Sequence, residues 1–132
     1  MTPTCLIAEA DPFIARLLRR FAEETGLEAL QARTGQEAIE LARQVQPVVI
    51  ILEPELPGKV RGWEAYRCLR ADGRTARIPI IACSWLPSAE AGELLGEPVA
   101  SMQKPELHYE DFIRALEQAG VQVGPRPLQS EG

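Results

Sequence analysis

Short apolar runs alternate along the chain with longer segments in which apolar residues recur every three or four positions. The first pattern is typical of strands inside a sheet, and the second of helices with one buried face. The predicted strands cover Thr4–Glu9, Leu27–Ala32, Val48–Leu52, Ile78–Ser84 and Pro98–Gln103. The predicted helices run from Pro12 to about Gly26, over Gly35–Gln46, after Gly62, over Ser88–Leu95, and from about Tyr109 to near Gly120.

The ends of these helices carry residues suited to helix boundaries. Asp11 and Pro12 supply an N-cap and a proline at the first helical position, and Gly26 suits a left-handed end. Pro47 stops the second helix. The residues expected on buried faces are Ile14, Leu17, Leu18 and Phe21 in the first helix, and Ala38, Leu41, Ala42 and Val45 in the second.

Strict alternation of strands and helices predicts an α/β fold with a parallel sheet covered on both faces. The apolar run Val48–Leu52 fits a strand that is buried on both sides. We expect a flavodoxin-like, doubly wound (βα)5 domain with a five-stranded parallel sheet in the order 2-1-3-4-5. Ligands of such folds bind at the carboxyl ends of the strands.

The composition fits one domain and narrows the function classes. The chain has 132 residues, 45% of them hydrophobic, which predicts a single domain over residues 1–122. Residues 123–132 read as a flexible tail, a linker to a further domain, or a cloning remnant. The formal charge of −5, without a basic stripe, argues against direct nucleic-acid binding. The absence of a long apolar stretch argues against a membrane span, so we expect a cytoplasmic protein whose three cysteines are reduced and buried.

Polar residues follow the strands at the edge where a binding site is expected. Glu9-Ala10-Asp11 follows the first strand, Glu53 the third, Ser84 ends the fourth, and Lys104 follows the fifth. In the expected strand order these four segments converge on one pocket.

In this arrangement the chain resembles a response-regulator receiver domain (CheY-like) over about residues 4–119. The resemblance implies a two-component signalling module in which an acidic pair holds Mg²⁺, an Asp accepts a phosphoryl group, a hydroxyl senses it, and a lysine pairs with it. The corresponding positions are Glu9 and Ala10, Glu53, Ser84 and Lys104. It also implies a cis peptide bond in the turn at Lys104-Pro105.

Several positions depart from the family's pattern. Ala10 cannot ligate a metal, so weak Mg²⁺ binding at Glu9 and Glu53 is the most we expect, and no other cofactor. Glu53 carries its carboxylate about 1.5 Å further out than an Asp would. Trp85 stands where a small residue is usual, and an indole there can cover the pocket. The family's switch aromatic is replaced by Ser101.

The sequence allows two interpretations each for Asp11 and for a pair between Lys104 and Glu53. Asp11 either caps the helix or compensates for Ala10 as a metal ligand, and the cap is the simpler hypothesis. A Lys104–Glu53 pair either holds the pocket in place of phosphate or is an inert relic.

The leading hypothesis is a degenerate receiver, a pseudo-receiver that is not an enzyme and works by protein–protein interaction independently of phosphorylation. Its expected partner is a signalling protein such as a histidine kinase or an effector domain, and a homodimer is an alternative. By analogy, the binding face comprises Leu94, Leu95, Ser101, Tyr109 and Ile113. The alternatives are a conventional receiver phosphorylated on Glu53 or Asp11, and a small α/β enzyme or flavin carrier, which the acidic loop after the first strand disfavours.

Overall fold

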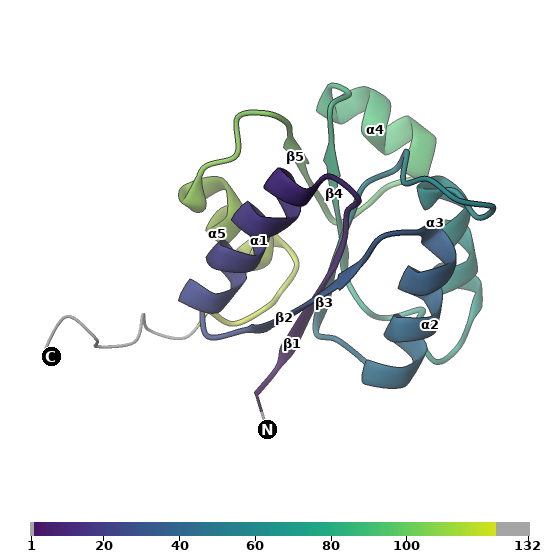
Figure 1. Ribbon diagram of the computed structural model, residues 1–132, viewed down its shortest axis with the longest axis horizontal. Helices are drawn as coiled ribbons and strands as arrows, with labels where there is room; N and C mark the ends of the chain where they lie inside the picture. Colours follow the sequence, from purple (N-terminus) through teal and green to yellow (C-terminus); the bar gives the residue numbers. More distant parts are fainter. Residues whose placement is uncertain (1, 124–132) are drawn as a thin grey trace, which may run out of the picture.

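A five-stranded parallel sheet forms the centre of the protein, as seen in the computed structural model, which describes residues 2–123 (Figure 1). Its strands are β1 (Thr4–Ala8), β2 (Glu28–Ala32), β3 (Val49–Leu52), β4 (Ile80–Ser84) and β5 (Ala100–Gln103). They are ordered β2-β1-β3-β4-β5, and every neighbouring pair is parallel. The predicted flavodoxin-like fold is therefore confirmed.

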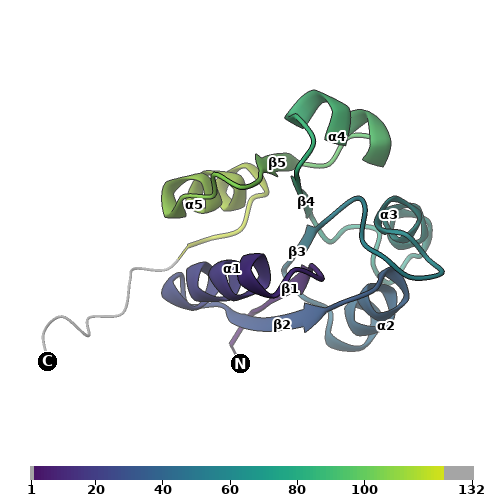
Figure 2. The same ribbon diagram turned by 45° about the horizontal axis from the view of Figure 1, so that its top comes forward.

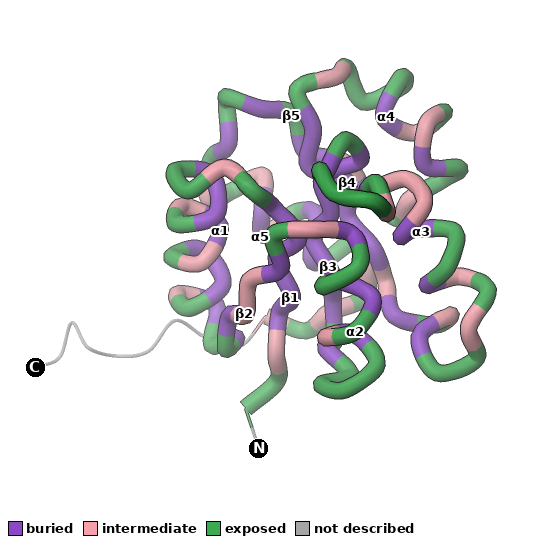
Figure 3. The backbone as a smooth tube through the Cα atoms, turned by 45° about the vertical axis from the view of Figure 1, so that its right-hand side comes forward, coloured by how far each residue is buried: buried purple, intermediate pink, exposed green. Residues whose placement is uncertain are grey.

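Five helices cover the sheet on both faces. They are α1 (Pro12–Glu24), α2 (Gly35–Val45), α3 (Gly62–Ala71), α4 (Ser88–Leu95) and α5 (Tyr109–Gln118). Helices α1 and α5 lie on one face, and α2, α3 and α4 lie on the other (Figure 2). Parallel strands need such crossover helices, which is why both faces of the sheet are buried (Figure 3).

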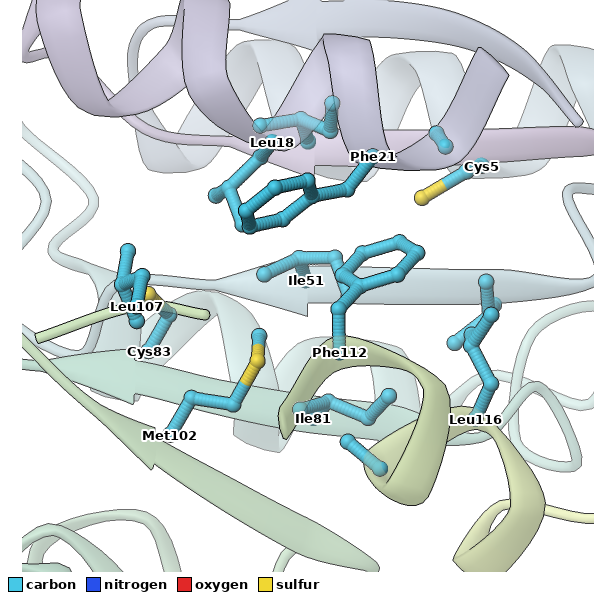
Figure 4. Packing of buried hydrophobic residues seen from close by; sticks show 14 of the residues in the cluster. Cys5, Leu18, Phe21, Ile51, Ile81, Cys83, Met102, Leu107, Phe112 and Leu116 are labelled. Atoms are coloured by element: carbon cyan, nitrogen blue, oxygen red, sulfur yellow. The ribbon is translucent and has the colours of Figure 1, made fainter. Parts of the chain in front are cut away.

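The side chains of the central strands alternate between two hydrophobic cores. Cys5 and Ile7 of β1 join the core under α1 and α5, whereas Leu6 and Ala8 join the core under α2, α3 and α4. Figure 4 shows the first core, where Phe112 of α5 lies near Phe21 of α1, with ring centroids 5.7 Å apart. Strands with two buried faces fix the sheet rigidly, so the strand ends are well placed to hold a site.

The structure corrects several details of the sequence prediction. Val48 lies before β3 and is 38% exposed, and Val45 is 36% exposed rather than packed inside. Cys68 is exposed on α3, whereas Cys5 and Cys83 are buried as expected. Three strands also begin later than predicted from Leu27, Ile78 and Pro98. Leu27 and Ile78 are buried in the core although they precede the paired residues, whereas Pro98 is only partly buried.

The loop between β3 and α3 approaches neighbouring backbone closely. A Cβ atom on Gly62 would fall under 3.0 Å from the carbonyl oxygen of Glu53. A Cβ atom on Gly35, at the start of α2, would meet the carbonyl of Val60 equally closely. Both glycines therefore let backbone pack on backbone, and Gly62 does so directly behind Glu53.

None of the helices within residues 2–123 has the length and apolarity to cross a membrane. The predicted tail lies almost wholly outside the described residues, since only Val123 of residues 123–132 falls among them.

Candidate functional site

Three charged side chains meet at the carboxyl end of the sheet, and all of them are buried. Glu9 follows β1, Glu53 follows the adjacent β3, and Lys104 follows β5. Their residues are only 3%, 6% and 3% exposed, respectively. Charged residues are rarely buried to this extent unless they are paired.

The Lys104 ammonium group lies between the two carboxylates. Its Nζ donates a hydrogen bond to Glu53 Oε1 at 2.5 Å and forms an ion pair with Glu9 Oε1 at 2.6 Å, the latter outside hydrogen-bond geometry. The second oxygen of each carboxylate accepts a backbone N–H two residues further on, at 3.0 Å from Asp11 and 2.9 Å from Glu55. All four carboxylate oxygens therefore contact a donor group.

The charges of this cluster favour a protonated lysine. Burial alone lowers the pKa of Lys104, but the close contacts with the carboxylates of Glu53 and Glu9 outweigh burial and raise the pKa above its usual value. At these distances each ion pair is worth about 6 kcal/mol at an effective dielectric constant of 20, before desolvation is subtracted. One positive charge faces two negative ones, so the cluster carries a formal charge of −1.

The other predicted pocket residues surround this cluster. Asp11 accepts hydrogen bonds from the backbone N–H groups of Phe13 and Ile14, which establishes it as the N-cap of α1. Ser84 is fully buried, and its Oγ accepts the N–H of Leu86.

Trp85 lies over the lysine at the surface of the cluster. Its ring centroid is 5.6 Å from Lys104 Nζ, within the range of a cation–π contact, and the residue is 52% exposed. The indole therefore contacts the buried ammonium group, while about half of the residue is exposed to solvent.

Magnesium requires near-octahedral coordination by oxygen, and the residues present do not fit it. Ala10 is exposed and offers no side-chain oxygen, while the glutamate oxygens already face Lys104 and backbone N–H groups. Across residues 2–123 there is also no group of three or more His, Cys, Asp or Glu residues arranged to hold a metal ion. We therefore assign no metal-dependent reaction step to this site.

Two further expectations concern the turn after β5 and the start of α5. The Lys104-Pro105 peptide bond is cis, as the resemblance implied. Tyr109, however, packs its ring edge-on against Phe21 at 5.7 Å, so it faces α1 rather than the surface assigned to it with Ser101.

A family model for the response regulator receiver domain matches residues 5–95. The chain belongs to this family. Receivers are signalling modules of two-component systems, and they interact with histidine kinases and effectors.

A curated relative supports the same assignment, and solved structures share the fold. The polar-differentiation response regulator DivK of Brucella ovis is 35% identical over 82 residues, a match that covers 62% of this chain and 66% of DivK. Among solved structures, a sensor protein from Polaromonas sp. JS666 is 27% identical, with a TM-score of 0.78 over 89% of this chain and 94% of that chain. The receiver domain of a Pseudomonas aeruginosa sensor histidine kinase, solved with magnesium in its active-site cleft, has a TM-score of 0.79 and 21% identity, covering 91% and 99% of the two chains.

One feature of this receiver's pocket was not predicted from the sequence. The sequence suggested that Lys104 pairs with Glu53, but not that the same ammonium group also reaches Glu9. Two acids at the ends of adjacent strands are the only signal for it, because the reach of a lysine from β5 depends on the twist of the folded sheet.

Proposed function

We propose that this receiver domain works independently of aspartyl phosphorylation, as a protein-binding module whose pocket is held closed by Lys104. The observation that carries the proposal is the position of the ammonium group between Glu9 and Glu53, where it contacts an oxygen of each. An internal cation therefore pairs with both acids that a receiver otherwise presents to a divalent ion, and it offsets one of their two negative charges.

The geometry of Glu53 supports this reading. Phosphorylation would require a free carboxylate oxygen, but Oε1 is bound by Lys104 and Oε2 by the N–H of Glu55. A side chain that is one methylene longer than Asp also displaces the reacting oxygen, and a misplacement of about 1 Å can cost about 100-fold in rate. Trp85 further narrows access from the solvent side.

The readout of phosphorylation is altered as well. Ser101, half-buried in β5, stands at the position of the family's switch aromatic, so no ring is available there to move inward. The pocket is better suited to hold one conformation than to alternate between two. We place the protein-binding surface on α4, β5 and α5, around Leu94, Ser101 and Ile113, which are all partly exposed.

A hollow of about 600 Å³ lies between β5 and α5 on this surface, and Ser101, Gln103 and Arg114 contribute to its lining. A partner side chain can enter such a hollow, and a histidine kinase, an effector domain or a second copy of the chain would each suit it. We propose no enzymatic activity for this pocket, since its three buried charged groups contact one another.

Intact-mass measurement after incubation with acetyl phosphate and Mg²⁺ tests the proposal. We expect no added phosphoryl group on the wild-type protein, while a conventional receiver treated in parallel gains one. A phosphoryl adduct that disappears in Glu53→Ala would overturn the proposal, and one that disappears only in Asp11→Ala would favour phosphorylation at the first loop.

A further inference from the structure

Three arginines surround a hollow of about 390 Å³ between α1 and β2, beside the pocket. The residues that line it are Ala10, Pro12, Arg16, Arg19, Gln31 and Arg33. Helix α1 runs alongside β2 in the fold (Figure 2). Ala10 follows β1 and Arg33 follows β2, so these two lining residues lie at the carboxyl ends of the strands, where Glu9 also lies. We propose that this hollow binds a small phosphorylated molecule.

The arginines are available for a ligand. In the part of the chain that the structure describes, Arg16, Arg19 and Arg33 form no ion pair. Arg19 donates from NH1 to the carbonyl oxygen of Ala29 at 3.1 Å, which fixes its guanidinium group against β2. A planar guanidinium matches the oxygens of a phosphoryl group and binds them through paired hydrogen bonds.

The neighbouring carboxylates are engaged elsewhere, and none of them lines the hollow. Glu37 accepts the backbone N–H of Arg33 at 2.7 Å and forms no ion pair with its guanidinium group. Glu9 contacts Lys104 and the N–H of Asp11, and Asp11 in turn caps α1, so neither acid lines the hollow. Gln31 donates from Nε2 to the carbonyl oxygen of Glu9 at 2.8 Å, which orients its amide. The lining therefore consists of cationic and neutral groups, although the chain as a whole carries a formal charge of −5.

Ala10 connects this hollow to the altered chemistry of the pocket. An acid at position 10, as in the family's acidic pair, would place a carboxylate in the lining and repel an anion. The loss of that acid removes a metal ligand and at the same time leaves no carboxylate among the residues that line the hollow.

The size and charge favour a small ligand over a polyanion. The volume lies within the range of about 300–1,000 Å³ that is usual for small-molecule sites. A net negative chain repels nucleic acid at long range, whereas a local arginine cluster still attracts a small dianion at short range.

Titration of the ¹⁵N-labelled protein with sodium pyrophosphate, at constant ionic strength, tests the inference. We expect saturable shifts at Ala10 and Arg33 and at the side-chain Nε–H of Arg16, with Kd below about 1 mM. Arg16→Gln combined with Arg33→Gln should weaken binding by more than about tenfold, and so should Ala10→Asp. All three positions are exposed, so these variants should fold, which circular dichroism checks.

Arg77→Gln is the matched control. Arg77 is exposed and precedes β4, so it lies at the amino ends of the strands, opposite the end that carries Glu9 and Glu53. This substitution should leave the Kd for pyrophosphate unchanged within about twofold. Shifts that never saturate, or an equal loss of binding in Arg77→Gln, would overturn the inference. It would also be overturned if a glutamate-rich peptide bound the hollow while pyrophosphate did not, since that result would assign the arginines to an acidic protein segment.

Discussion

Replacing Lys104 with methionine tests how the pocket is held together. Methionine keeps much of the length of the lysine side chain but removes the charge, so Glu9 and Glu53 lose the one cation they share. Their side chains are only 4% and 8% exposed, so water cannot take over the role of the ammonium group. Breaking a buried pair in this way typically costs about 3–5 kcal/mol.

This cost is not the same quantity as the net contribution of the intact cluster to the free energy of unfolding. The two ion pairs contribute about 12 kcal/mol of attraction at an effective dielectric constant of 20, but the repulsion between the two carboxylates and the desolvation of each ion offset much of it. A neutral cluster of similar shape should therefore be nearly as stable as the native one. The triple variant Lys104→Met, Glu9→Gln and Glu53→Gln should regain most of the stability that Lys104→Met loses.

Urea unfolding followed by circular dichroism measures these differences in the free energy of unfolding. Lys59→Met is the matched control, because Lys59 is exposed in the loop after β3 and its loss should change stability by no more than about 0.5 kcal/mol. A cost below about 1 kcal/mol for Lys104→Met would refute the reasoning. So would a triple variant no more stable than the single one.

Three further predictions concern the loop, the core and the first helix. Gly62→Ala should lower the free energy of unfolding by at least about 2 kcal/mol, because its Cβ meets the Glu53 carbonyl, whereas Gly73→Ala, which meets nothing within 4 Å, should be nearly neutral in the same urea assay. Burial raises the pKa of Cys83 from 9.0 to about 12, more than the charge of Lys104 lowers it, so the folded state holds this proton more tightly. The stabilisation that comes from this tighter proton binding is complete below pH 9 and is lost as the pH rises toward 12. The free energy of unfolding therefore falls at alkaline pH, and Cys83→Ala should make that fall smaller by about 1.4 kcal/mol at pH 10. Asp11→Ala should cost about 1 kcal/mol in thermal or urea unfolding through loss of the α1 cap, whereas Asp11→Asn, which keeps a cap, should cost much less.

The fold was largely readable from the sequence because its signals are local. Apolar runs of strand length, an Asp-Pro helix start and glycine or proline stops predict the order of elements without any long-range information. Exposure at the element ends was less predictable. Val48 extends an apolar run but lies outside β3, since whether a terminal residue is covered depends on packing rather than on its neighbours in sequence.

The site was predictable only in part, for the same physical reason. Parallel strands bring their carboxyl ends together, so Glu9, Glu53 and Lys104 were expected in one place. Which atoms contact one another was not predictable, because this depends on how far side chains reach across strands and on the direction in which the Lys104 side chain points after β5. Helical spacing brings Arg16 and Arg19 of α1 together, but no local pattern indicates that Arg33, which follows β2, lines the same hollow.

We propose that Lys104 takes the place of an external cation and that Glu53 therefore does not enter a phosphorylated state. Fluorine-19 NMR of the wild-type protein with Mg²⁺ and beryllofluoride, a mimic of the phosphoryl group, tests it most directly. The account predicts only the signals of free fluoride species and unchanged backbone resonances at Glu53, Ser84 and Lys104. A saturable protein-bound fluorine signal, accompanied by shifts at these three residues, would contradict it.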